Sequence, residues 1–217
     1  MEERNTSGTV EAGEAATAHK ATERLTFFSD AVVAIAMTLL AIDLPVPTGA
    51  TTAEFLHSLD EGVLEYLCFL VSFAVIGAHW RAHHGVFRYV DRADGPVVLL
   101  NLLWLLLVVL TPFLTRVLGE GESVAFVRFG MYATGQAVQL VTMAALIVVI
   151  SRRGWFAPTA PVSLSRRGWV AALISAVAFT LSVPAFLLIG PWAFALWLVL
   201  PVALHRISQR TGITARP

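Results

Sequence analysis

The chain alternates long apolar stretches with short polar connections. Six stretches are long or apolar enough to be considered as membrane spans: residues 24–45, 63–87, 96–118, 124–150, 169–189 and 191–204. About twenty apolar residues at about 1.5 Å rise per residue match the roughly 30 Å hydrocarbon core of a bilayer. The last stretch is the shortest and contains Pro201, so it is the weakest of the six. The pattern predicts an all-α polytopic membrane protein with six transmembrane helices.

Composition supports this class. Of the 217 residues, 57% are hydrophobic and 14% are charged, and the mean hydropathy of +0.73 is far above that of a soluble domain. The single cysteine, Cys68, excludes an internal disulfide framework and is expected to pack as a small apolar residue. We expect three segments: a disordered cytoplasmic tail over 1–22, a six-helix channel domain over 23–206, and a cytoplasmic C-terminal tail over 207–217.

The basic residues predict the orientation in the membrane. With six spans, thirteen of the fifteen lysines and arginines fall on one side, and only Arg116 and Arg128 fall on the other. The positive-inside rule then places both termini in the cytoplasm. We expect the protein to lie in the cell (plasma) membrane. The opposite side carries acidic loops around Asp43 and Glu120, which either concentrate cations or are ordinary solvated loops.

The first span, over 24–45, differs from the others in carrying a carboxylate, Asp30, within its apolar stretch. A charge at that depth costs a few kcal/mol unless it has a partner, so Asp30 is a candidate functional residue. At about 100° per residue, Ile35, Thr38, Leu39 and Ile42 share one narrow stripe, and Asp30 lies about 140° away from Ile35. One face of the helix therefore presents an apolar stripe, and another turns the acid toward neighbouring helices.

The same residues carry a family resemblance. The string Arg24-x-x-x-Phe28-Ser29-Asp30, followed by Ala34-Ile35 and Thr38-Leu39-Leu40, resembles the first helix of the transmembrane protein 175 family of potassium channels of lysosomes and bacteria. The motif is long and rare, although it covers under a tenth of the chain. The resemblance implies one six-helix unit per chain and a homotetramer arranged around the first helices.

The resemblance also implies roles for particular residues. In the family, a Trp and a His of the second helix and an Asn of the third support the Phe-Ser-Asp segment. Here the matching positions are Trp80, His83 or His84, and Asn101; which histidine reaches Asp30 or Ser29 is left open. The family's isoleucine constriction and selectivity threonine correspond to Ile35 and Thr38, and the conducted ion is potassium in preference to sodium.

A mechanism follows from what the chain lacks. It has no Thr-Val-Gly-Tyr-Gly carbonyl filter, so we hypothesise that Ile35, Leu39 and Ile42 of four copies form stacked apolar rings that gate by dewetting. Thr38 would offer a hydroxyl oxygen to a passing cation. Ile, Leu and Thr at this spacing are also typical of simple helix packing.

Two other classes of function remain open. A haem or metal redox protein would use His79, His83 and His84, and a proton-coupled transporter would use Asp30 and His84. No nucleophile elbow, P-loop or His-Glu-x-x-His motif is present, which argues against an enzyme. We expect no cofactor, no metal and no nucleic-acid partner; the expected partners are other copies of the chain, the lipid bilayer and monovalent cations.

Overall fold

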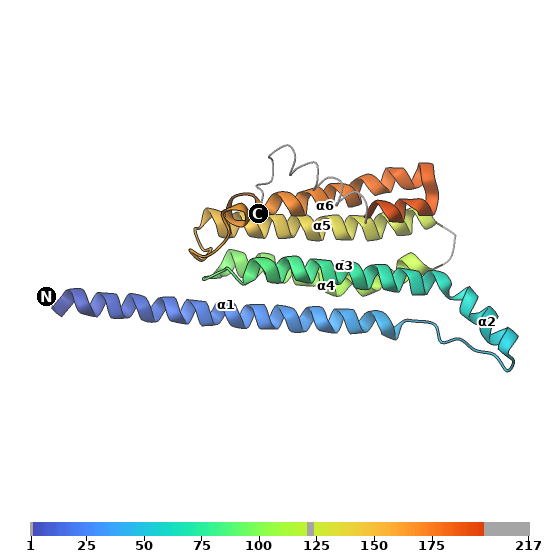
Figure 1. Cartoon of the computed structure of the whole chain (residues 1–217), viewed down its shortest axis with the longest axis horizontal. Helices are drawn as coiled ribbons and strands as arrows, with labels where there is room; N and C mark the ends of the chain where they lie inside the picture. Colours follow the sequence, from blue (N-terminus) through green and yellow to red (C-terminus); the bar gives the residue numbers. More distant parts are fainter. Residues whose placement is uncertain (1, 121–123, 198–217) are drawn as a thin grey trace.

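The computed structural model describes residues 2–120 and 124–197, and their regular structure is helical. The described residues form six α-helices and a short 3-10 helix, and Figure 1 shows how the α-helices are arranged. They are α1 (Glu2–Ile42), α2 (Thr52–Glu61), α3 (Val63–Phe87), α4 (Gly95–Gly119), α5 (Ala125–Arg152), α6 (Val162–Ile189) and η1 (Gly190–Ala193).

The long helices form three layers. α1 packs against α3 and α4, α4 packs against α5, and α5 packs against α6. In Figure 1, α1 runs along one outer side of the molecule, α3 and α4 form the middle layer, and α5 and α6 lie on the opposite side. Among residues 2–120 and 124–197, one large side of α1 is therefore left without a neighbour.

Five helices are long and apolar enough to cross a membrane, among the described residues: the segment Ala16–Ile42 of α1, and α3, α4, α5 and α6. The chain is a multi-pass membrane protein. The predicted second, third and fourth spans agree with α3, α4 and α5 to within two residues. α6 begins at Val162, seven residues before the predicted 169, because the helix includes the mostly polar residues 162–168, which the apolar pattern left out. The sixth predicted span, 191–204, is described only as far as residue 197, and its second half, 198–204, lies outside the described residues.

The start of α1 differs from the prediction. The composition of residues 1–22 predicts a disordered tail, whereas the helix of the first span is continuous from Glu2. Residues 10–24 contain no proline and are rich in alanine and glutamate, which are good helix formers. Extending an existing helix also avoids the cost of a new nucleus.

The helix α2 is a second difference, because residues 46–62 were expected to be only an acidic loop. Thr51 accepts a hydrogen bond from the backbone N–H of Glu54, and the Glu54 carboxylate accepts one from the backbone N–H of Thr51. This reciprocal pair is a capping box, which defines where a helix begins. The Thr-x-x-Glu spacing in the sequence was the signal that the prediction missed.

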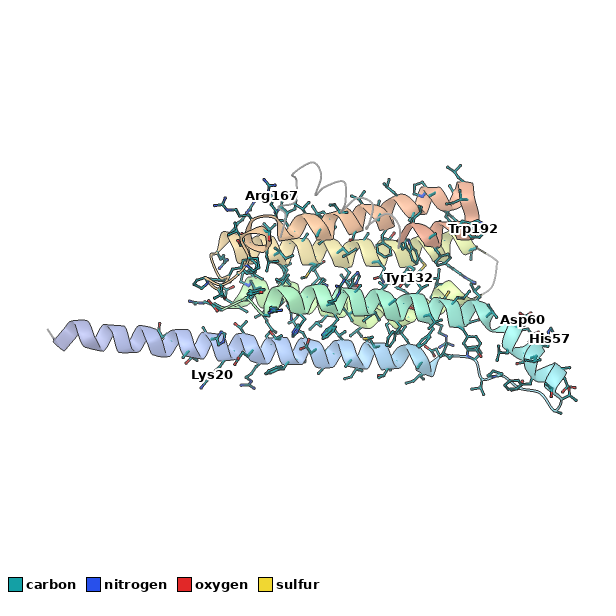
Figure 2. The ribbon with its side chains drawn as sticks, in the orientation of Figure 1. Lys20, His57, Asp60, Tyr132, Arg167 and Trp192 are labelled. Atoms are coloured by element: carbon teal, nitrogen blue, oxygen red, sulfur yellow. The ribbon has the colours of Figure 1, made fainter. Side chains whose placement is uncertain are left out.

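The charged residues separate the two ends of the bundle. We call the end with the α3–α4 and α5–α6 connections the basic end, and the end with α2 the acidic end. Figure 2 shows Lys20 and Arg167 toward the basic end, and His57 and Asp60 at the acidic end. Cys68 is buried and unpaired near the acidic end, as expected for a small packing residue.

Candidate functional site

The helix α1 has two faces with opposite environments. Val33, Ala36 and Leu40 are 0–4% exposed and belong to a core shared with α3, α4 and α5. On the other face Ile35 is 59%, Leu39 38% and Ile42 74% exposed within the single chain. The predicted stripe is thus an uncovered apolar ridge, available to lipid or to another helix.

A buried chain of hydrogen bonds fixes the inner face of α1 to the middle layer. Ser29, His83 and Asn101 are all fully buried. The Asn101 amide nitrogen donates to Ser29 Oγ at 2.9 Å, and the Asn101 carbonyl oxygen lies 2.8 Å from His83 Nε2. Because a carbonyl oxygen only accepts, His83 Nε2 carries the proton. One amide therefore links α1, α3 and α4.

Asp30 has its own partners at the same depth. The Trp80 indole N–H donates to Asp30 Oδ1 at 2.8 Å, and His84 Nδ1 lies 3.8 Å from Asp30 Oδ2. The Asp30 side chain is 30% exposed, so the carboxylate lies at the margin of the α1–α3 contact. The two adjacent histidines have different partners: His84 faces Asp30, and His83 faces Asn101.

The ring of His83 is held by stacking as well as by its hydrogen bond. It lies between Phe87 and Trp104, with ring centroids 4.2 and 4.3 Å away and interplanar angles of 17°. Neither aromatic residue was predicted from the sequence to belong to the site. Their spacing was the available signal, because Phe87 is four residues after His83 and Trp104 is three after Asn101, so each pair shares a helix face.

The surroundings of His83 bear on the alternative function, a redox protein that binds haem or a metal through the histidines of α3. His83 is buried, stacked on both faces and bonded through Nε2. In residues 2–120 and 124–197, no group of three or more His, Cys, Asp or Glu side chains is arranged to hold a metal ion. His83 and His84 contact polar side chains of the same chain, Asn101 and Asp30, and His79 is buried elsewhere on α3.

Thr38 lies on the exposed side of α1, next to the ridge. Its hydroxyl donates to the backbone carbonyl of Ile35 at 2.8 Å. The proton is thus engaged within the helix, and the lone pairs of the oxygen remain able to accept or to face a cation. Arg24 and Phe28, the other two motif residues, lie outside the polar network with exposed side chains.

A second group of buried polar side chains joins the middle layer to α5. Thr115 donates to Ser72 Oγ at 2.8 Å, and Ser72 donates to the Tyr132 hydroxyl oxygen at 3.1 Å. Gln136 Nε2 reaches Thr111 Oγ1 at 3.4 Å. These contacts hold α3, α4 and α5 together within one chain.

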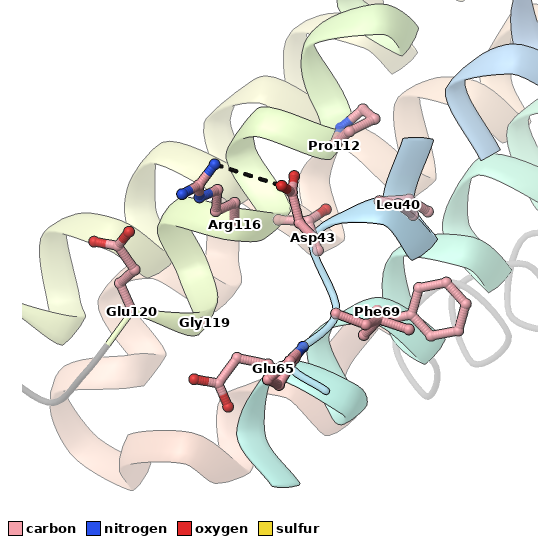
Figure 3. Close-up of a pocket in the computed structure, with 11 residues that line it drawn as sticks. Leu40, Asp43, Glu65, Phe69, Pro112, Arg116, Gly119 and Glu120 are labelled. Carbon is pink, nitrogen blue, oxygen red and sulfur yellow. Dashed lines mark hydrogen bonds and ion pairs between the residues drawn. The ribbon is translucent and has the colours of Figure 1, made fainter. Parts of the chain in front are cut away.

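A pocket of about 210 Å³ lies at the acidic end, beside the end of α1 (Figure 3). Asp43, which follows α1, forms an ion pair with Arg116 of α4 at 3.4 Å across it. Glu65 and Glu120 also border the pocket. The pocket is separate from the Ser29–Asp30 network, which lies at the middle of the membrane-spanning segment Ala16–Ile42.

The chain is similar to known ion-channel proteins. The family model described as endosomal/lysosomal potassium channel TMEM175 matches residues 24–112, which include α1 from its motif onward, α3 and most of α4. A protein from Streptomyces collinus named potassium channel is 36% identical over 134 residues, covering 60% of this chain and 65% of the relative. The endosomal/lysosomal proton channel TMEM175 of Bos taurus is 38% identical over 89 residues, covering 37% of this chain and 19% of the relative.

A solved structure is also similar. The crystal structure of a lysosomal potassium-selective channel TMEM175 homolog from Chamaesiphon minutus matches with a TM-score of 0.66 and 29% sequence identity, covering 88% of this chain and 99% of that chain. The curated relatives described here are matched over less than two thirds of their own lengths. All the residues of the buried polar network fall inside the matched range 24–112. The first-helix motif and these matches confirm the predicted resemblance of the chain to the TMEM175 family.

Proposed function

We propose that this protein is a potassium-selective cation channel, and not an enzyme, in which four copies of α1 surround a central pore. Ile35, Leu39 and Ile42 would form apolar rings that act as the gate, and Thr38 would contribute to the preference for potassium over sodium. The proposal places the homotetramer in the plasma membrane with both termini in the cytoplasm.

One observation carries the proposal: the contacts of α1 with α3 and α4 determine which face of the helix points away from its own chain. The Ser29–Asn101–His83 chain and the Asp30–Trp80 bond hold one side of the helix against α3 and α4. The uncovered ridge then faces away from its own chain. A single helix cannot enclose a pore, so the ridge needs copies of itself to do so.

The relatives support the choice of ion. The bacterial relatives are named potassium channels, and the vertebrate relatives are named proton channels. The hydroxyl of Thr38, beside the ridge, would provide an oxygen ligand for a cation. Rings formed by the aliphatic side chains of several copies can only exclude water. We therefore propose potassium as the conducted ion and treat proton flux as the competing outcome of the same assay.

The direct test is flux through purified protein in liposomes. We expect potassium flux that follows the electrochemical gradient without saturating, and that exceeds sodium flux at equal gradients. Flux that saturates and tracks an imposed proton gradient would instead identify a coupled transporter. A coloured preparation with a haem absorption band would indicate the redox alternative.

The role of Thr38 is tested by replacing its hydroxyl while keeping its shape. Thr38→Val is expected to lower the potassium-to-sodium permeability ratio several-fold, because valine is β-branched but has no oxygen. The ratio is measured from reversal potentials with potassium on one side and sodium on the other. Thr38→Ser, which keeps the oxygen, is the matched control and should retain most of the preference; equal ratios in both variants would remove Thr38 from the selectivity mechanism.

Asp30 is expected to support assembly more than selectivity. Asp30→Ala removes the acceptor of the Trp80 N–H and the partner of His84, so the tetramer fraction in detergent should fall. Size-exclusion chromatography with light scattering measures this fraction. A variant that assembles normally and changes only its ion preference would contradict the assignment.

A further inference from the structure

The two connections at the basic end are joined into one surface. The α3–α4 connection (88–94) and the α5–α6 connection (153–161) meet in an isolated antiparallel bridge between Val90 and Phe156. The Asp91 N–H donates to the Trp155 carbonyl at 3.0 Å, and the Ala157 N–H donates to the Tyr89 carbonyl at 2.8 Å. Segments about 65 residues apart in sequence are thus held together by backbone hydrogen bonds on both sides of the bridge.

Arginines from both connections gather on the aromatic residues of this surface. The guanidinium carbons of Arg92 and Arg153 lie 5.9 and 5.0 Å from the centre of the same Trp155 ring. Arg88 lies 4.9 Å from the centre of the Tyr89 ring. We call the group of Arg88, Arg92, Arg153, Tyr89 and Trp155 the arginine platform.

The charge of the platform is only partly balanced. Asp94 pairs with Arg153 at 2.9 Å, and Asp91 lies 3.9 Å from His19 of α1. Arg88 and Arg92 are exposed, and two further exposed arginines flank the α5–α6 connection: Arg152 at the end of α5 and Arg166 near the start of α6. Two guanidinium groups brought to one indole repel each other, so a bound anion would lower the free energy of this arrangement.

We propose that the arginine platform binds the headgroup of an anionic phospholipid. The platform begins one residue after α3 ends and one residue after α5 ends, so it lies at headgroup depth when these helices span a bilayer. Trp and Tyr side chains favour this interfacial zone, and guanidinium groups match phosphate oxygens in a bidentate way. Basic residues that only set the orientation of the chain in the membrane need no defined arrangement. Here, in contrast, backbone hydrogen bonds join the two connections into one defined surface.

The test uses the full chain purified in detergent with equal amounts of phosphatidylglycerol and phosphatidylcholine. Native mass spectrometry then counts the lipids that stay bound. Wild-type protein is expected to retain phosphatidylglycerol in preference to phosphatidylcholine. The double variant Arg88→Gln/Arg92→Gln should lose about fivefold in this preference for each arginine removed, while Arg153 and its ion pair with Asp94 stay intact.

Arg116→Gln is the matched control, because it removes an exposed arginine at the acidic end. It should leave the lipid preference unchanged. An unchanged preference in the double variant, or an equal loss in Arg116→Gln, would overturn the platform as the site. A third arm adds inorganic phosphate in large excess: it should not displace the lipid, and complete displacement would mean that the site binds free phosphate instead of a membrane lipid.

Discussion

Liposomes that contain the Ile35→Asn variant are expected to leak potassium at least about tenfold faster than liposomes with the wild-type protein. A tenfold change needs only about 1.4 kcal/mol in the barrier, which is no more than the cost of removing one buried isoleucine side chain from apolar surroundings. Four amide side chains in one ring would let water into the constriction and remove the dewetting barrier. Potassium flux measured with a fluorescent indicator provides the comparison.

Ile35→Leu is the control for this experiment. It keeps the apolar character and nearly the same volume, so flux should stay near the wild-type level. Both variants must elute as the same assembled particle, since Ile35 is exposed in the single chain and its replacement should not disturb the subunit core. A correctly assembled Asn variant with wild-type flux would exclude Ile35 from the gate.

The second large effect is expected at Asn101. Asn101→Leu leaves the buried His83 Nε2–H without its acceptor and removes the donor to Ser29 Oγ, while the Ser29 hydroxyl still donates to the Leu25 carbonyl. The unpaired His83 donor alone costs about 1–3 kcal/mol, which is a substantial part of a typical stability of 5–15 kcal/mol. We expect a marked fall in the midpoint of thermal unfolding in detergent, and fewer assembled tetramers.

A double-mutant cycle separates this loss from simple mispacking. His83→Phe should keep the stack with Phe87 and Trp104 while removing the ring N–H. Combined with Asn101→Leu, it should cost less than the sum of the two single changes, because the unpaired donor is then absent. Strict additivity would show that Asn101 and His83 act independently.

Much of the fold could be predicted from the hydrophobic pattern. The spans over 63–87, 96–118 and 124–150 appear as α3, α4 and α5 because a membrane helix has to be apolar along its whole length. The resemblance to the family predicted which kinds of residue contact Asp30, a tryptophan and a histidine of the second span. The choice between His83 and His84 was not, since adjacent helical residues point about 100° apart and both directions hold a polar partner.

Other features depend on contacts that a linear pattern does not contain. The bridge between Val90 and Phe156 joins two connections far apart in sequence, and no local signal in either connection indicates the other. The exposure of Ile35 and Ile42 follows from where α3 and α4 pack, which periodicity alone leaves open. α2 did have a local signal, the capping pair Thr51 and Glu54, within a segment interpreted only by its charge.

The positions of the polar ties along α1 have a mechanical consequence. Ser29 and Asp30 anchor the helix toward the basic end, while the half that carries Ile42 is held by aliphatic packing and by the exposed Asp43–Arg116 pair, worth roughly 0–1 kcal/mol. The helix can therefore tilt about Asp30. Ile42 lies twelve residues, or about 18 Å, from Asp30. A tilt of only about 5° would move Ile42 by about 1.5 Å and leave Ser29 and Asp30 in place.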